Sequence, residues 1–282
     1  MDLQRLAAAR LVAEPQGGVA SRRQLYAAGL QEIHVRRAVE SGRWRLHGRH
    51  TVAVHTGPLD VVAQRWRAVW EVGESIAVLD GVTALQADGL RTFDDERIHV
   101  SAKHNHNTVP LDGIRIHKVI RRVEGELVRA GVPRTRPAVA AIRAAHWAQS
   151  DRQAALVLLM VVQQRLTSPG LLATEQRRIR GRTRRAFIKG VVGDIAFGVQ
   201  SLGELDFARL CRARGIPEPC RQVVRQGPRG RLYLDVGWSC CDLVVEVDGA
   251  QHREGVHVML DNLRQTAHTS HRCRFDVSHG HG

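Results

Sequence analysis

The sequence contains no hydrophobic run long enough to cross a membrane. Its most apolar stretch, residues 154–162, is far shorter than the roughly 20 residues that a membrane-spanning helix needs. Residues 1–10 lack the apolar core of a secretory signal and have the pattern of a short amphipathic helix. We therefore expect a cytoplasmic protein with no membrane partner.

Cysteine is scarce, with 5 in 282 residues, and no paired C-x-x-C spacing occurs. The odd number and the missing spacing argue against both a disulfide framework and a zinc ribbon. Also absent are a Walker-type phosphate loop, a dinucleotide fingerprint and a Gly-x-Ser-x-Gly elbow. These absences disfavour nucleotide hydrolysis, redox chemistry and acyl transfer, and we expect no small-molecule cofactor.

Acidic residues are outnumbered, with 28 Asp and Glu against 42 Lys and Arg, which gives a net charge of +14. Such a balance favours a polyanionic partner, and DNA is the partner that we expect. The alternative is an arginine-rich composition that has no bearing on function.

Residues 1–56 have the pattern of a winged helix-turn-helix domain. Ser21 is a good N-cap for a helix over 22–28, Gly29 permits a tight turn, and residues 31–41 form a second helix. Gly42 ends that helix, and residues 44–54 then predict two short strands around Gly48, which would form the wing.

Basic residues concentrate on the second helix and the wing. There they suit contacts with phosphates of the DNA backbone. A winged helix that serves only as a protein–protein module, with a solvated basic face, is the alternative. The predicted DNA-binding residues are Arg36, Arg37, Arg43, Arg45 and Arg49.

Residues 57–200 alternate helical and strand patterns and predict an α/β middle domain that ends in basic helices. Two helices, around 136–148 and 151–166, precede a third that carries seven basic residues with no intervening acid. This run suits a phosphate backbone, although such a run is also typical of a solvated helix face. Its members are Arg177, Arg178, Arg180, Arg182, Arg184, Arg185 and Lys189.

Residues 201–282 contain acids in an apolar setting. The segment 243–247 is almost wholly apolar and β-branched around Glu246, so it predicts a buried strand, where a carboxylate is costly without a cation or partner. Glu246 and Asp248 share one face of an extended chain, and Asp235 of a paired strand is placed to join them. A structural ion-pair network with arginines is the alternative interpretation.

Three carboxylates provide the hard oxygen ligands that Mg²⁺ or Mn²⁺ takes, and such an ion supports phosphodiester hydrolysis. His252 is a candidate proton shuttle, and Gln251 is a candidate for orienting a water. Glu204, near the start of a predicted helix after Ser201, is a further candidate catalytic acid. It suits a capping box equally well.

These acids lie in three strings, Ser201–Leu205, Arg231–Val236 and Val244–His252. The strings resemble the actinobacterial domain-of-unknown-function family related to the very short patch repair endonuclease, within the PD-(D/E)XK nuclease superfamily. The resemblance covers roughly residues 200–265. It implies a restriction-endonuclease-like α/β core with Asp235 and Glu246 at the superfamily's Asp and Glu positions, Asp248 replacing the Lys, and Glu204 as the preceding helical acid.

The N-terminal part, about residues 1–50, separately resembles the winged-helix domain of AbiEi-type antitoxins. Residues 58–200 are similar to the middle region of comparable two-part proteins. In the nuclease-like family a further core strand and a closing helix follow, whereas the chain from about residue 266 is unpatterned. We therefore expect a truncated nuclease-like core.

Together these features predict a mixed, multidomain α/β protein that binds DNA and carries a Mg²⁺-dependent endonuclease-like domain. The alternative is a non-enzymatic, DNA-binding transcriptional regulator that resembles a type IV antitoxin, with an inactive nuclease-like domain. Loss of Arg36 and Arg37 would abolish operator binding by such a regulator, and loss of the acids would not.

Overall fold

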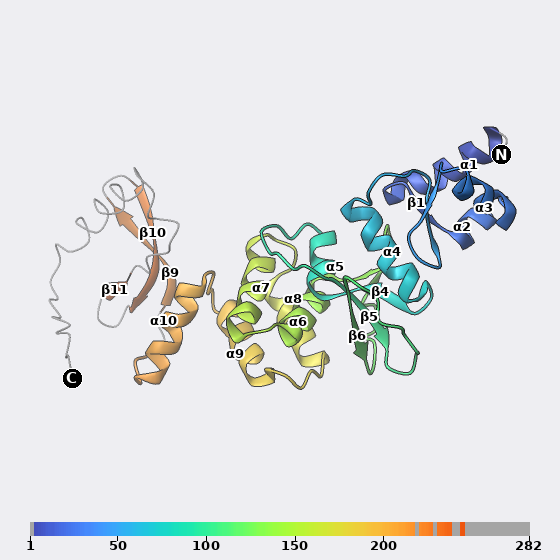
Figure 1. The fold of residues 1–282 in the computed structure, drawn as a ribbon. Helices are drawn as coiled ribbons and strands as arrows, with labels where there is room; N and C mark the ends of the chain where they lie inside the picture. Colours follow the sequence, from blue (N-terminus) through green and yellow to red (C-terminus); the bar gives the residue numbers. More distant parts are fainter. Residues whose placement is uncertain (1–2, 218–219, 228–229, 239–242, 246–282) are drawn as a thin grey trace, which may run out of the picture. The chain divides into compact units, whose positions relative to one another are not determined.

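The computed structural model describes residues 3–217, 220–227, 230–238 and 243–245 of the chain (Figure 1). Contacts divide the chain into two compact units, Met1–Val192 and Gly193–Gly282. Helices and sheets occur in both units, so the mixed, multidomain α/β fold is confirmed. Within the described residues, no helix combines the length and the apolar character required to span a bilayer.

The first unit begins with a winged helix. A three-stranded antiparallel sheet in the order β1-β3-β2 accompanies three helices, whose buried side chains include Leu25, Val35, Trp44 and Val52. The elements are α1 (Leu3–Ala13), a 3₁₀ helix η1 (Glu14–Gln16), β1 (Val19–Ser21), α2 (Arg22–Ala27), α3 (Glu32–Glu40), β2 (Arg45–Leu46) and β3 (Thr51–Ala53).

The predicted turn chemistry of this domain is confirmed. Ser21 and Gln24 form a reciprocal capping box, in which the Gln24 amide donates to Ser21 Oγ at 3.2 Å and the Ser21 amide donates to Gln24 Oε1 at 2.9 Å. Gly29 and Gly42 have φ angles of 87° and 69°, which only glycine adopts at little cost. Strand β1, which pairs with β3, has no counterpart in the prediction.

A five-stranded sheet in the order β6-β5-β4-β8-β7 forms the centre of the rest of this unit. The β5–β6 and β4–β8 pairs are parallel, and the β4–β5 and β7–β8 pairs are antiparallel. The strands are β4 (Ala77–Leu79), β5 (Ile98–Lys103), β6 (Ile114–Val119), β7 (Leu127–Val128) and β8 (Arg134–Thr135).

Helix α6 is the buried helix of this region. It packs against α5, α7 and α8, and its residues from Ala138 to His146 are all buried (Figure 1). The helices are α4 (Val61–Gly73), α5 (Gly81–Ala87), α6 (Pro137–Trp147), α7 (Asp151–Gln163), α8 (Pro169–Arg178) and α9 (Arg185–Ala196).

The single basic helix predicted over residues 177–189 is wrong. Helix α8 ends at Arg178 and α9 begins at Arg185, with an irregular segment between them. Gly181 lies so close to the His146 imidazole that a Cβ atom would not fit, and Arg184 has a φ angle of 57°, outside the helical region. The break is therefore caused by packing against α6, which the local sequence does not reveal.

The second unit contains α10 (Leu202–Ala213) and an antiparallel sheet in the order β11-β10-β9. Its strands are β9 (Cys220–Gly227), β10 (Gly230–Trp238) and β11 (Leu243–Val245), and the first two pair as an antiparallel hairpin. The Trp238 indole is buried, donates to the Pro217 carbonyl at 2.8 Å and packs edge-on against Phe207.

Candidate nucleic-acid interface

Helix α3 presents arginines to solvent because its apolar residues face the domain core. Val35 and Ala38 are buried, whereas Arg36 and Arg37 are exposed. Arg36 Nε lies 3.8 Å from Glu40 Oε1. Because both side chains are exposed, this ion pair contributes little to stability. Both guanidinium groups therefore lie on the outer surface of the second helix of the helix-turn-helix.

The other three predicted DNA-binding residues are also exposed, and they follow α3 along the chain. Arg43 lies in the turn after α3, Arg45 in β2, and Arg49 in the β2–β3 loop that forms the tip of the wing. All five predicted arginines thus lie on α3, the adjoining turn or the wing.

Helix α4 holds the tip of the wing through one carboxylate. Glu71 Oε2 accepts a hydrogen bond from the Arg49 amide at 2.8 Å, and Oε1 accepts from the amides of His50 and Thr51 at 2.9 and 2.8 Å. Successive backbone N–H groups that converge on an anion form a nest. Arg67 of α4 adds a 2.8 Å bond to the His47 carbonyl. The wing is therefore fixed before any ligand arrives, while the Arg49 side chain remains exposed.

A second basic surface is a groove of about 1050 Å³ in the same unit. It lies between the segment that follows β6 and the irregular segment between α8 and α9, with α6 contributing to its lining. We call it the basic groove. Its charged lining residues are Lys118, Arg121, Arg122, Glu124, Arg143, Arg177, Arg178, Arg180 and Arg182.

The segment between α8 and α9 is shaped by contacts with neighbouring helices. His146 Nδ1 is hydrogen-bonded to the Thr183 carbonyl, and Arg184 Nε donates to Asp151 at the start of α7 at 2.8 Å. These contacts hold the segment away from helical geometry. Arg180 and Arg182 are consequently displayed on the exposed part of the groove lining.

The inner part of the groove rests on a buried network of charged side chains. Asp80 Oδ2 accepts from Arg143 at 2.7 Å, and the other guanidinium nitrogen of Arg143 donates to Glu126 at 2.8 Å. Asp80, Glu126 and Arg143 have exposed fractions of 0, 1 and 4%. Arg122 donates to Glu126 at 2.9 Å and to the Ser101 carbonyl at 2.9 Å. The network thus joins the segment after β6 to the sheet and to α6.

Asp80 is saturated with hydrogen bonds. Its Oδ1 accepts from the Gly81 amide and from Thr135 Oγ1 at 2.8 and 2.9 Å, and its Oδ2 also accepts from Ser101 Oγ at 2.5 Å. Burial alone would lower the pKa of Arg143, but Asp80 and Glu126 raise it above its usual value. These arginines are therefore committed to the structure.

The arginines on the outer part of the basic groove are not held by carboxylates in this way. Within the described part of the chain, Arg121, Arg180 and Arg182 are exposed and have no carboxylate at ion-pair distance. By contrast, Arg178 pairs with Glu175 at 3.1 Å. Unpaired guanidinium groups gathered along a groove suit phosphate oxygens, to which they donate in a bidentate manner.

Sequence reasoning identified the arginines from Arg177 onward but missed the opposite wall. The basic string Lys118-Val-Ile-Arg-Arg122, which begins at the end of β6, carries the signal for that wall. Arg143 could not be identified in this way, because it is a single basic residue in an apolar helix.

The candidate nuclease residues fall largely outside the described residues. Glu246, Asp248, Gln251 and His252 lie there, and Asp235 lies in β10 between Leu234, which pairs with Val223, and Val236, which pairs with Val245. Among the side chains that the structure describes, no three His, Cys, Asp or Glu gather as a metal ion requires. The Mg²⁺ or Mn²⁺ site therefore stays a prediction.

Glu204 is described, and its carboxylate takes part in the cap of α10. Oε1 accepts from Ser201 Oγ at 2.9 Å, Oε2 accepts from the Gln200 amide at 3.2 Å, and the Glu204 amide donates to Ser201 Oγ at 3.1 Å. The capping interpretation accounts for its position, and a catalytic role for Glu204 stays a prediction.

Comparisons with known proteins give no family for this chain. No protein-family model and no curated protein matches it. Among solved structures, the crystal structure of the RV2827C protein from Mycobacterium tuberculosis is similar, with a TM-score of 0.43 and 15% sequence identity. The match covers 68% of this chain and 78% of that protein. A similarity at this level supports no functional inference.

Proposed function

We propose that this chain binds duplex DNA, with α3 in the major groove and the wing on the adjacent backbone. The observation that carries the proposal is the set of exposed arginines on α3, the following turn and a wing that Glu71 holds in place. A winged helix docks its second helix in the major groove, where arginines bind base edges or phosphates.

The basic groove supplies a further phosphate contact in this proposal. Arg121, Arg180 and Arg182 are exposed and lack carboxylate partners among the described residues, so their charge is available to a polyanion. Each phosphate neutralised by the protein releases counterions, and this release drives association most strongly at low salt.

The second part of the proposal is hydrolysis of DNA by the C-terminal unit. It is favoured by the pairing of β10, which carries Asp235, with β11, which ends one residue before Glu246 in the sequence. Asp235, Glu246 and Asp248 would supply oxygen ligands to Mg²⁺, which lowers the pKa of a bound water. The competing proposal is a non-enzymatic regulator that uses only the winged helix.

The DNA-binding proposal is tested by fluorescence anisotropy with a labelled duplex at several salt concentrations. We expect Arg36→Ala/Arg37→Ala to weaken binding at least about tenfold and to reduce the salt slope by about 0.9 for each lost phosphate contact. Arg91→Ala/Arg129→Ala removes the same charge from exposed positions elsewhere in the unit and serves as the control. Equal losses in the two double variants would reject docking through α3.

Nicking of a supercoiled plasmid in Mg²⁺ separates the two versions of the proposal. Activity in the wild type that is lost in Asp235→Ala/Glu246→Ala, with duplex binding retained, supports the nuclease. Equal nicking by both proteins rejects the assigned carboxylates. Binding of DNA without Mg²⁺-dependent nicking supports the regulator.

A further inference from the structure

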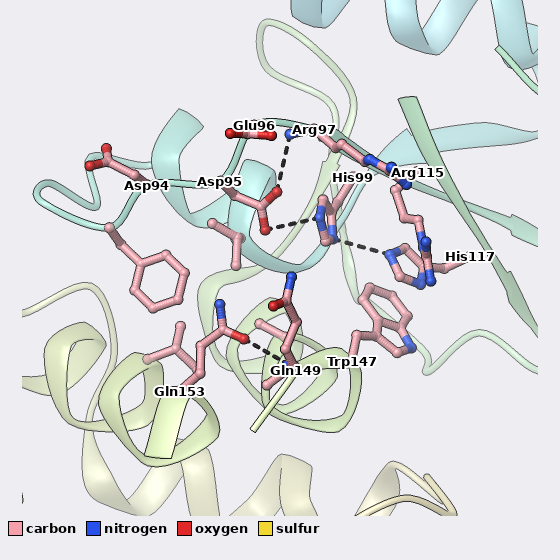
Figure 2. A pocket seen from close by; sticks show the side chains of 15 residues that line it. Asp94, Asp95, Glu96, Arg97, His99, Arg115, His117, Trp147, Gln149 and Gln153 are labelled. Atoms are coloured by element: carbon pink, nitrogen blue, oxygen red, sulfur yellow. Dashed lines mark hydrogen bonds and ion pairs between the residues drawn. The ribbon is translucent and has the colours of Figure 1, made fainter. Parts of the chain in front are cut away.

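Two partly buried histidines and an aspartate form a continuous series of hydrogen bonds beside a second pocket of the same unit. His99 Nε2 lies 3.2 Å from Asp95 Oδ2, and His99 Nδ1 lies 3.1 Å from His117 Nε2 (Figure 2). His99 of β5 is in register with Arg115 of β6, and His117 is two residues further along the same strand face. The arrangement therefore depends on the parallel pairing of these strands.

The Asp95 carboxylate determines which ring nitrogen carries the proton in His99 and in His117. Asp95 accepts, so His99 carries its proton on Nε2, and Nδ1 of the same ring accepts the Nε2 proton of His117. His117 Nδ1 is then left with an exposed lone pair. Burial, followed by the influence of His99, lowers the pKa of His117 to about 3, so the ring is a neutral acceptor at physiological pH.

The position of His117 is fixed by stacking. Its ring lies parallel to the Trp147 indole, with centroids 3.6 Å apart and an interplanar angle of 8°. Nδ1 of His117 has no hydrogen-bond partner among the described residues.

These side chains border a pocket of about 580 Å³. Pockets for small molecules fall in the range of about 300–1,000 Å³. Val82, Phe93 and Val157 contribute apolar surface, and Gln149 and Gln153 contribute amide groups. Figure 2 shows both glutamines reaching from α7 and the segment before it toward the space beside Asp95 and His99. The volume is far larger than a single phosphate ion requires.

The rim of the pocket carries two arginines on the same side as His117. Arg97 and Arg115 are exposed, and neither has a carboxylate at ion-pair distance within the described part of the chain. In Figure 2 their side chains lie toward His117, whereas the carboxylate of Asp94 lies on the opposite side of Asp95 and that of Glu96 lies above Asp95. Anion-binding groups and the free imidazole acceptor are therefore adjacent.

We propose that this pocket binds a nucleoside monophosphate, with the phosphate between Arg97 and Arg115 and a ligand hydroxyl donating to His117 Nδ1. The base would lie over the apolar surface and pair its polar edge with the amides of Gln149 and Gln153. This site is separate from the arginines assigned to DNA, so its failure leaves the DNA-binding proposal untouched.

Isothermal titration of the full chain tests this site with the four ribonucleoside 5′-monophosphates, their nucleosides and inorganic phosphate. We expect at least one monophosphate to bind at least about tenfold more tightly than its nucleoside and than inorganic phosphate. The reason is that the phosphate and the nucleoside each contribute to the binding free energy. Equal affinity for inorganic phosphate would overturn the nucleotide proposal, and so would the absence of measurable binding by every monophosphate.

Two variants locate the bound nucleotide. His117→Gln keeps an amide donor toward His99 but removes the Nδ1 acceptor, and Arg97→Gln/Arg115→Gln removes charge from exposed positions, where folding is little affected. We expect the double arginine variant to weaken binding at least about tenfold, since charge-assisted bonds are the strong ones. His117→Gln removes a neutral hydrogen bond and should weaken binding about fivefold. Arg180→Gln/Arg182→Gln in the basic groove should bind as the wild type does. Loss of binding only in this groove variant would place the nucleotide elsewhere and overturn the proposal.

A thermal midpoint measurement provides the second readout. Bound nucleotide raises the midpoint of the native protein by mass action. We expect the full rise in the wild type and in His104→Gln, an exposed histidine away from the pocket lining, and a smaller rise in His117→Gln and Arg97→Gln/Arg115→Gln. An unchanged rise in both pocket variants would contradict the assignment.

Discussion

Arg143 and Arg182 line the same groove, yet their surroundings differ completely. Arg143 is 4% exposed and bound to Asp80 and Glu126, whereas Arg182 is exposed with no carboxylate at ion-pair distance among the described residues. The buried guanidinium group of Arg143 belongs to the scaffold, because together with Arg122 it balances the charges of the two carboxylates. An exposed guanidinium group without a carboxylate partner adds to the positive electrostatic potential outside the protein. Net charge alone does not distinguish these two uses of arginine.

Replacing Arg143 should have the largest effect on stability. Arg143→Met removes the partner of two buried carboxylates, and breaking a buried pair in this way typically costs about 3–5 kcal/mol. Denaturant unfolding of the full chain measures this loss. Arg182→Met is the matched control and should change the free energy of unfolding by less than about 0.5 kcal/mol. Similar losses in the two variants would remove the distinction between them.

Removing the exposed arginines should reverse this pattern. We expect Arg121→Gln/Arg180→Gln/Arg182→Gln to leave stability within about 0.5 kcal/mol of the wild type while weakening duplex binding about tenfold or more. Anisotropy titrations at several salt concentrations measure the binding. The triple variant should also have a shallower salt dependence. Unchanged affinity and slope would show that the basic groove does not contact the phosphate backbone.

Acid should protonate the partly buried His117 and leave the charge of the arginines unchanged, because among unperturbed side chains only histidine titrates between about pH 5 and 8. Burial lowers the pKa of His117 to about 3, whereas the unfolded chain takes up this proton near 6.5. The unfolded state therefore binds more protons between these values, and stability falls as the pH decreases below 6.5. His117 contributes at most about 1.4 kcal/mol per pH unit.

The measurement is the denaturant midpoint at pH 7.5 and at pH 5.0 for three proteins. His117→Gln should show a smaller decrease on acidification than the wild type, and His104→Gln should match the wild type. Burial also lowers the pKa values of His99 and His146, so a residual decrease is expected in every protein. A decrease in His117→Gln as large as in the wild type would contradict the assigned burial of a neutral ring.

The winged helix was predictable because its signals are local. Ser21 caps a helix, Gly29 and Gly42 permit turns with positive φ, and the apolar spacing of Val35 and Ala38 defines the buried face of α3. Strands β7 and β8 were missed because their two-residue lengths carry no periodicity. The break at Gly181 was missed because His146 on another helix imposes it.

The site residues divide in a similar way. Exposed arginines in one short segment, such as Arg36 and Arg37, could be identified from composition and helix position. The Asp95–His99–His117 chain could not, because it depends on the register of β5 against β6. The partnership of Asp80 with Arg143 spans 63 positions of sequence and has no local signature.

The hydrogen bonds between Glu71 and the wing have a practical consequence for testing the proposed DNA binding. Because main-chain amides make the bonds at positions 49 and 50, their side chains are free to vary, provided that neither becomes proline. Gly48 has no such freedom, since a Cβ atom there would collide with the Glu71 carboxylate. Residues 49 and 50 can therefore be substituted to introduce new base contacts without changing the rest of the domain.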